Sequence, residues 1–189
     1  MFLFLVPLVL GFAFNLMSAF TTAFSRRWGE RRGSIVTVIL RDVLGIPVWA
    51  IGFVLAIRTP SLTLIVSTIF TEVLGWLVIG AGGAIIVVAL VTIRLHAAMP
   101  STGDPLVHNG IYAYVRHPIH AGTFLEFTGL FLIRPTLAVA SACALGVVWV
   151  LLQTRFEELD LLQRMPSYPE YMNRVPRFSP RLQKRRSTS

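Results

Sequence analysis

Long apolar segments dominate the first 98 residues and return over residues 119–153. About 20 consecutive apolar residues are enough to cross the hydrocarbon core of a bilayer as a helix. The whole sequence is 54% hydrophobic and only 14% charged, with a mean hydropathy of +0.69. A soluble domain of this size rarely has such a composition. We therefore predict an all-α fold, a polytopic membrane helix bundle.

The apolar pattern predicts about five transmembrane helices. They are expected at residues 1–24, 35–57, 72–95, 119–133 and 136–153. Residues 25–33 are expected to form a charged loop, with Ser34 as the N-cap of the second helix. The last two segments form a helical hairpin over 119–153, broken at Arg134-Pro135, and its first arm is short or tilted. Four glycines of the third span permit either close helix packing or a bend: Gly75, Gly80, Gly82 and Gly83.

Positive charge is confined to three regions of the chain. Of the 17 lysines and arginines, 15 fall within residues 25–41, 94–118 and 155–189. With five spans these regions share one side, which the positive-inside rule makes cytoplasmic, with the N-terminus outside. The same distribution argues against nucleic acid as a partner, because such proteins carry their basic residues on one soluble face.

Two polar blocks lie between and after the apolar segments, at residues 106–122 and 153–180, and they divide the chain. We expect N-terminal transmembrane helices at 1–98, a catalytic region at 99–180 that includes the hairpin, and a flexible basic tail at 181–189. The tail is expected to be attracted to anionic lipid. The partners that we predict are the lipid bilayer and an amphipathic small molecule; the oligomeric state is left open.

The first polar block, LVHNGIYAYVRHPIHAG, places histidines next to a predicted helix start at Pro118. Free N–H groups at a helix N-terminus favour an anionic group. A metal site is an alternative, because His117 and His120 stand three apart and can share a helix face. Their spacing matches no strong metal motif, so we predict no metal site. The single cysteine, Cys143, is expected to be inert packing.

The second polar block places Glu157 and Glu158 at the end of the last apolar helix. Neighbouring side chains of a helix point in different directions. We therefore expect at most one of the two carboxylates to face a site.

Together the blocks resemble a known family. LVHNGIYAYVRHPIHAG is similar to the LVxxGxYxxxRHPxYxG signature of the isoprenylcysteine carboxyl methyltransferases and phospholipid methyltransferases. FEELDLLQRMPSYPEYMNRVPRFSP is similar to the EExxL…YxxYxxRVPRxxP ending of that family. The resemblance covers about the last 80 residues, whereas the first 90 share only hydropathy.

The resemblance implies an integral membrane methyltransferase that binds S-adenosylmethionine at the cytosolic side, between the two motifs. The cofactor-binding residues that the resemblance implies are Leu106, Val107, Tyr112, His117, Pro118 and Glu157. We also predict that Asp104, Arg116 and Gly122 contribute to cofactor binding.

Several positions depart from the family pattern. Asp104 stands where the family often has histidine, and His120 stands where it has tyrosine. Gln153 replaces the arginine that precedes the cofactor glutamate by four residues in the prenylcysteine enzymes, with Arg155 nearby. Residues 165–168, MPSY, replace the usual FGxxY. The resemblance therefore does not define the methyl acceptor.

We predict methyl transfer to a lipid-like or amphipathic acceptor that arrives from the bilayer. A carboxylate acceptor needs a cation to orient it, for which Arg155 is the candidate. An amine acceptor needs a base that holds it neutral, for which His120, Glu158 and Asp104 are candidates.

Two other functions remain open from sequence. One is an NADPH-dependent membrane reductase of the sterol-reductase type. The other is a non-enzymatic membrane scaffold, which a distance above about 15 Å between His117 and Glu157 would favour.

Overall fold

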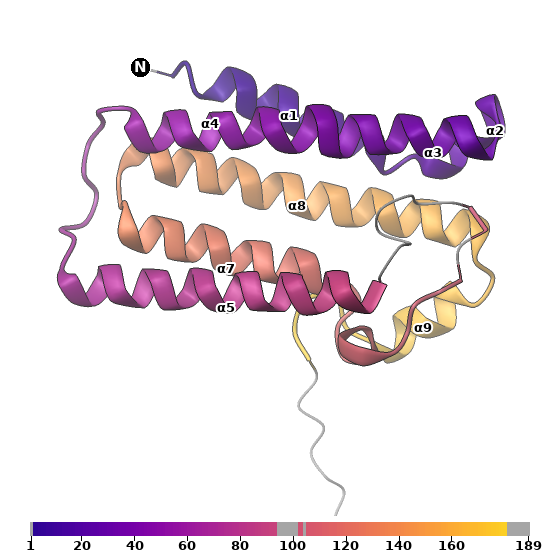
Figure 1. Cartoon of the computed structure of the whole chain (residues 1–189). Helices are drawn as coiled ribbons and strands as arrows, with labels where there is room; N and C mark the ends of the chain where they lie inside the picture. Colours follow the sequence, from indigo (N-terminus) through magenta and orange to yellow (C-terminus); the bar gives the residue numbers. More distant parts are fainter. Residues whose placement is uncertain (1, 94–101, 104, 181–189) are drawn as a thin grey trace, which may run out of the picture.

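The regular structure of the protein is helical throughout the part described by the computed structural model, residues 2–93, 102–103 and 105–180 (Figure 1). The helices are α1 (Leu5–Ser18), α2 (Thr21–Trp28), α3 (Glu30–Val38), the π-helical η1 (Ile39–Gly45), α4 (Ile46–Arg58), α5 (Ile69–Ile93), the 3-10 helix η2 (Gly110–Ala113), α7 (Pro118–Ile133), α8 (Leu137–Arg164) and α9 (Tyr168–Arg174). Asp104, His96 and the basic tail at 181–189 lie outside the described residues. The all-α fold class is confirmed.

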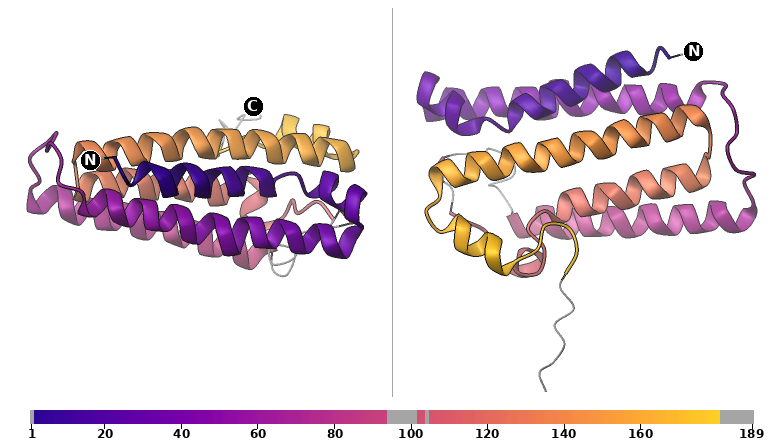
Figure 2. Two further views of the ribbon diagram at one scale, coloured as in Figure 1. Left: turned by 90° about the horizontal axis from the view of Figure 1, so that it is seen from above. Right: turned by 180° about the vertical axis from the view of Figure 1, so that it is seen from behind.

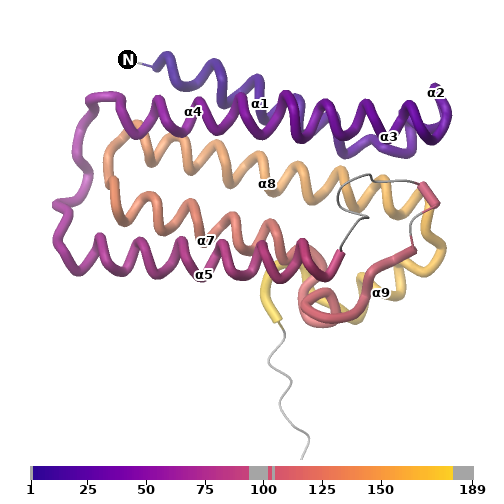
Figure 3. Tube along the Cα trace, in the orientation of Figure 1, coloured from indigo at the N-terminus to yellow at the C-terminus, as the bar shows by residue number. Residues whose placement is uncertain are grey.

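Three helices of the described chain are long and apolar enough to cross a membrane. They are the continuous helix Glu30–Arg58, which comprises α3, η1 and α4, and the helices α5 and α8. A fourth candidate is the pair α1 and α2, which bends by 63° between its two helices (Figure 3). Helix α7 is apolar but has 16 residues, or about 24 Å, against about 30 Å of hydrocarbon. The first hairpin arm is thus short, as expected, and the number of candidate spans is three to four rather than five.

Three helix boundaries differ from the sequence prediction. The first span is broken after Ser18, and Arg26 and Arg27 lie on α2 rather than in a loop. Gly29, with φ +83°, separates α2 from α3 in a conformation that glycine adopts without strain. The second span therefore begins at Glu30 and not after Ser34.

The last long helix also extends further than predicted. It ends at Arg164 rather than near Gln153, because no glycine or proline lies between Gln153 and Pro166. Glu157 and Glu158 consequently lie inside α8, which continues for more than one helical turn beyond Glu158.

The polar segments gather at one end of the bundle. Helices α2 and α9, the C-terminal ends of α5 and α8, and the N-terminal end of α7 all lie there (Figures 1 and 2). The two turns at the other end are joined by backbone hydrogen bonds, Leu64 N–H to Pro135 O and Leu137 N–H to Leu62 O, each 2.8 Å long. The described parts of the three basic regions therefore share one end, as the charge count requires.

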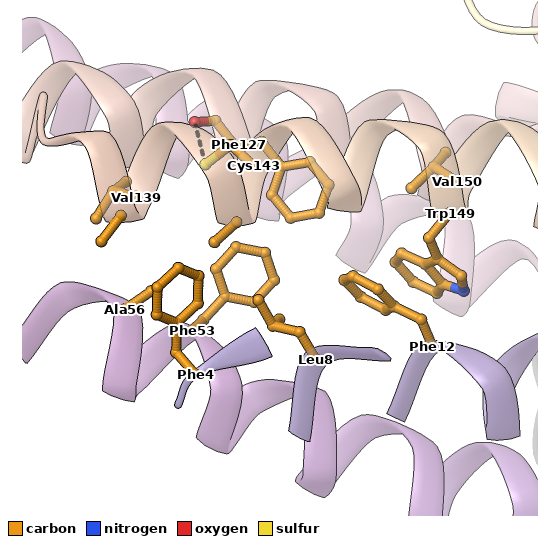
Figure 4. Close-up of a cluster of buried hydrophobic side chains, with 12 residues drawn as sticks. Phe4, Leu8, Phe12, Phe53, Ala56, Phe127, Val139, Cys143, Trp149 and Val150 are labelled. Atoms are coloured by element: carbon orange, nitrogen blue, oxygen red, sulfur yellow. Dashed lines mark hydrogen bonds between the residues drawn. The ribbon is translucent and has the colours of Figure 1, made fainter. Parts of the chain in front are cut away.

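An aromatic core holds α1, α4, α7 and α8 together (Figure 4). The rings of Phe12 and Trp149 stack with centroids 4.7 Å apart, and those of Phe53 and Phe127 stack at 5.3 Å. Cys143 is buried in the same cluster, and its thiol contacts the carbonyl oxygen of Phe127 at 3.5 Å. The role of Cys143 is therefore to fill space in this packed core.

Helices α5 and α7 pack backbone against backbone through two glycine pairs. A Cβ at Gly129 would lie 2.5 Å from the carbonyl oxygen of Gly75, and one at Gly122 would lie 2.6 Å from that of Gly82. The two pairs are seven residues apart along each helix, Gly75 and Gly82 on α5 and Gly122 and Gly129 on α7, so the contact repeats after two turns. Close packing is thus confirmed at Gly75 and Gly82, and α5 is continuous, so the glycines do not interrupt the helix.

This contact predicts opposite effects for the same substitution at two glycines. Gly129→Ala should lower the unfolding temperature in detergent, because the new methyl group meets the Gly75 carbonyl and overpacking costs about 1–3 kcal/mol. Gly80→Ala is the matched control, because nothing lies within 4 Å of its added Cβ. Helix propensity alone should leave that variant as stable as the parent or more stable. Equal stability of the two variants would contradict the glycine contact.

Candidate functional site

The carboxylate of Glu158 joins the two polar blocks. It is fully buried and accepts hydrogen bonds from Arg116 Nη2 at 2.9 Å and from Arg177 Nε at 3.0 Å, while Arg177 Nη2 bonds its second oxygen. Arg116 Nη1 also donates to the carbonyl oxygens of Met172 and Val175. These contacts tie the segment before α7 and the segment after α9 to helix α8.

Backbone hydrogen bonds strengthen the same connection. Arg116 N–H donates to Pro176 O, and His117 N–H donates to Arg177 O, each at 2.9 Å. The RVPR segment, residues 174–177, therefore fixes the backbone from which the His117 side chain projects.

His117 lies between both carboxylates of α8. Its Nδ1 is 3.6 Å from Glu157 Oε2, and its Nε2 is 3.4 Å from Glu158 Oε1. Both carboxylates thus lie near the imidazole, one beside each nitrogen, but only the Glu157 side chain is partly exposed. The 3.6 Å separation is also far below the 15 Å that would have favoured a scaffold.

The two carboxylates control the protonation of His117. Burial alone lowers the pKa of this imidazole, but the hydrogen-bonding and charge interactions with Glu157 and Glu158 outweigh burial and raise the pKa above its usual value. A positive charge on His117 is therefore favoured while both carboxylates are ionised.

His120 lies beside His117, one turn into α7. The two rings are almost parallel, at 8°, with centroids 5.4 Å apart. Thr154 Oγ1 is 2.9 Å from His120 Nδ1, and His120 Nε2 is 3.9 Å from Glu157 Oε1. Gln153 Nε2 donates to that same Glu157 oxygen at 2.9 Å. Both histidine side chains therefore lie against the same side of α8.

A cavity of about 190 Å³ opens next to His117. Its walls are mainly apolar and aromatic, with few polar groups, as is usual for small-molecule sites. It is lined by Ile93, Pro105, Leu106, Val107, Tyr112, Arg116, His117, Leu161, Arg164, Met165, Tyr168 and Tyr171. A second cavity, of about 540 Å³, shares the first four of these residues. The two cavities are therefore adjoining parts of one concave surface.

Buried tyrosines form one wall of the smaller cavity. Tyr171 donates its hydroxyl proton to the carbonyl oxygen of Tyr112 at 2.6 Å. Burial raises the pKa of Tyr171 to about 12 and also raises the pKa of Tyr112 and of Tyr168. These phenols remain neutral near pH 7 and supply aromatic surface rather than charge.

The structure brings together most of the predicted site residues. Leu106, Val107, Tyr112, Arg116 and His117 line the cavity. His120, Glu157 and Glu158 surround His117. Pro118 is fully buried at the start of α7.

Three predicted residues are placed differently. Gly122 packs against the Gly82 carbonyl of α5, so its missing side chain serves helix packing rather than a ligand. Arg155 is exposed, on the face of α8 that also exposes Leu151 and Leu159. It is not part of the His117 cluster, by which we mean His117, His120, Glu157 and Glu158. Glu158 forms ion pairs with the guanidinium groups of Arg116 and Arg177, which favours a structural role for its carboxylate over a role as a general base. Because these hydrogen bonds use both of its oxygens, the carboxylate is poorly placed to accept a proton from a substrate.

Sequence reasoning missed Arg177, Thr154 and Tyr171. The RVPR motif signalled Arg177, but only its partner Glu158 explains its role. Thr154 precedes Glu158 by one helical turn, a position that the sequence alone does not distinguish from other polar positions of α8.

Comparison with known proteins gives a family. A family model described as phospholipid methyltransferase matches residues 61–167. The chain is 34% identical over 100 residues to the cobalt-zinc-cadmium resistance protein CzcN of Cupriavidus metallidurans, covering 50% of this chain and 46% of that protein. It is 32% identical over 100 residues to the nickel-cobalt-cadmium resistance protein NccN of Alcaligenes xylosoxydans xylosoxydans, covering 51% of this chain and 47% of that protein. The chain thus spans about half the length of these relatives, and no solved structure matches it.

The ion pairs of Glu158 predict a large stability loss on truncation. Glu158→Ala leaves Arg116 buried without its counter-ion, which costs about 3–5 kcal/mol, and should lower the unfolding temperature markedly. Glu170→Ala is the control, because its pair with Arg174 is exposed on both sides and is worth about 0–1 kcal/mol. Thermal unfolding of both variants in the same detergent checks this, and a Glu158 variant as stable as the control would contradict the structural role.

Proposed function

This chain belongs to the phospholipid methyltransferase family, and we propose that it is an integral membrane methyltransferase that takes its methyl group from S-adenosylmethionine. The observation that carries the proposal is the assembly of both polar blocks around His117, beside an apolar cavity at one end of a membrane helix bundle. A soluble cofactor can reach that end from water, while an apolar acceptor can reach it along the helices.

The side chains present fit such a cofactor. Leu106, Val107 and Tyr112 offer the aliphatic and aromatic walls that an adenosine moiety needs. Among the described residues, Gln153 Oε1 is buried without a hydrogen-bond partner, and it is available to a polar ligand. The smaller cavity is below the usual 300–1,000 Å³ of ligand sites, so the ligand would extend into the larger one.

We assign the polar end of the cofactor to His117 and Glu157. The Glu157 side chain is about one-third exposed, unlike that of Glu158, so its carboxylate can accept hydrogen bonds from hydroxyl or ammonium groups. When bound, the cofactor would supply a methyl group on a sulfonium, and in-line attack of the acceptor on the methyl carbon would release S-adenosylhomocysteine. The protein must then align the acceptor and exclude water.

The geometry favours an amphipathic amine as the acceptor over a carboxylate. Arg155 faces away from the cluster, and Arg116 and Arg177 are both engaged by Glu158. His120, whose Nε2 lies 3.9 Å from Glu157 Oε1, is the better-placed base for an amine. We further propose that the polar end of the bundle faces the cytoplasm, because it carries the described basic segments.

The relatives suggest a second candidate function. Their names refer to resistance to cobalt, zinc, cadmium and nickel, and the His117 cluster contains residue types that bind such ions. A part in metal resistance is compatible with methyl transfer at the same site.

Binding of S-adenosylhomocysteine tests the proposed function. Calorimetric titration of the protein in nanodiscs should show binding, and NADPH, titrated in parallel, should not bind. Glu157→Ala should weaken S-adenosylhomocysteine binding at least tenfold, because it removes the accessible carboxylate, whereas Glu170→Ala should leave it unchanged. Binding of NADPH instead would support the reductase, and unchanged affinity in the Glu157 variant would remove the assigned site.

A further inference from the structure

Three side chains able to bind a metal ion converge at the helix end described above. His117, His120 and Glu157 each offer one ligand atom, and these atoms lie within 4.8 Å of one another. All three are buried or half-buried, so the cluster is not a chance grouping of exposed acidic residues. It was not expected from sequence, because the third ligand comes from a helix about 40 residues further along the chain.

The hydrogen bonds of Thr154 define which nitrogen of His120 is free. The Thr154 hydroxyl has one proton and lies 2.8 Å from the Val150 carbonyl oxygen, which can only accept. The hydroxyl therefore donates to Val150 and accepts a hydrogen bond from His120 Nδ1–H at 2.9 Å. In the neutral ring, the lone pair of Nε2 then points towards the Glu157 carboxylate, 3.9 Å away.

Two acceptors that face each other at this distance favour a cation between them. The Glu157 carboxylate is held in place by Gln153 Nε2 at 2.9 Å. A second imidazole nitrogen, His117 Nδ1, lies 3.6 Å from the other oxygen of Glu157. One nitrogen of each histidine and one carboxylate oxygen thus lie within 4.8 Å of one another.

The outer contacts are those of a metal site. A ligating histidine usually donates its second N–H to a carboxylate or another oxygen, which fixes the ring. His117 has Glu158 Oε1 at 3.4 Å from its Nε2, and His120 has Thr154 on its Nδ1. Both rings therefore have an oxygen on the side away from the cluster.

We propose that His117 Nδ1, His120 Nε2 and the Glu157 carboxylate bind a divalent transition-metal ion such as Zn²⁺ or Co²⁺. Two imidazoles and a carboxylate are a ligand set that suits these ions and leaves a fourth position for water. His120 stands where the family signature has tyrosine, so the His120 ligand is a departure of this chain from that signature. Binding displaces a proton from His117.

The site overlaps the one assigned to the methyl donor, which has a regulatory consequence. This second part rests on the proposed function, because it takes His117 and Glu157 as donor-binding residues. The two side chains cannot hold both ligands at once, so a bound metal ion excludes the methyl donor. Divalent metal thus inhibits methyl transfer competitively with the donor.

Metal binding is tested first, without any donor. Protein without a histidine tag, in nanodiscs, is titrated with CoCl₂, and bound Co²⁺ is followed by its visible absorption and by competition with ZnCl₂. We expect one ion per chain and an affinity at least tenfold weaker in His120→Tyr. His108→Tyr, at an exposed histidine, is the matched control and should bind as the parent does.

A second variant covers the case in which His120→Tyr fails to fold. Thr154→Val keeps the shape of the side chain but removes the oxygen that fixes the His120 ring, and should weaken Co²⁺ binding about tenfold. Failure of the parent to bind Co²⁺, or equal binding by the parent, His120→Tyr and Thr154→Val, would overturn the site.

Mutual exclusion is tested by titrating S-adenosylhomocysteine with and without saturating ZnCl₂. We expect the apparent Kd for S-adenosylhomocysteine to rise at least tenfold in the parent and to be unaffected by zinc in His120→Tyr. An unchanged Kd in the parent would overturn the exclusion. Co²⁺ binding without any S-adenosylhomocysteine binding would overturn the proposed function but not the metal site. S-adenosylhomocysteine binding without any Co²⁺ binding would overturn the metal site but not the proposed function.

Discussion

The polar end of the molecule depends on one buried charge, the carboxylate of Glu158. A carboxylate in this position is costly unless it is paired and hydrogen-bonded, and Arg116 and Arg177 provide both. Because the two arginines come from segments about 60 residues apart, the pairing brings the first polar block onto α8. His117 is placed as a result, since its neighbour Arg116 is bound to Glu158 and its own N–H is bound to the Arg177 carbonyl oxygen.

The membrane helices determine where this cluster lies. The glycine contacts of α5 and α7 bring two helices to backbone distance, so that the end of α5 forms a wall of the cavity with Ile93. The stacked pair of Phe12 and Trp149 holds α1 against α8 (Figure 4). The apolar bundle thus carries a polar site at its end.

Much of this arrangement follows from sequence. Apolar runs and the distribution of arginine predict the bundle and its common basic end, and two motifs predict the residues around the cavity. Helix ends were less predictable: α8 continues beyond Gln153 to Arg164, and its polar part packs against the RVPR segment, a contact between distant residues. For the same reason, sequence did not reveal that Glu158 is a structural anchor, that Arg155 faces outward, or that His120 meets Glu157.

An experimental structure of the protein in nanodiscs with S-adenosylhomocysteine bound would test the central claim most directly. We predict adenosine against Leu106, Val107 and Tyr112, and the polar end of the ligand in hydrogen-bond contact with Glu157, while Glu158 remains paired with both arginines. A ligand bound elsewhere, or a Glu157 carboxylate out of contact with it, would contradict the assembly of a methyl-donor site around His117.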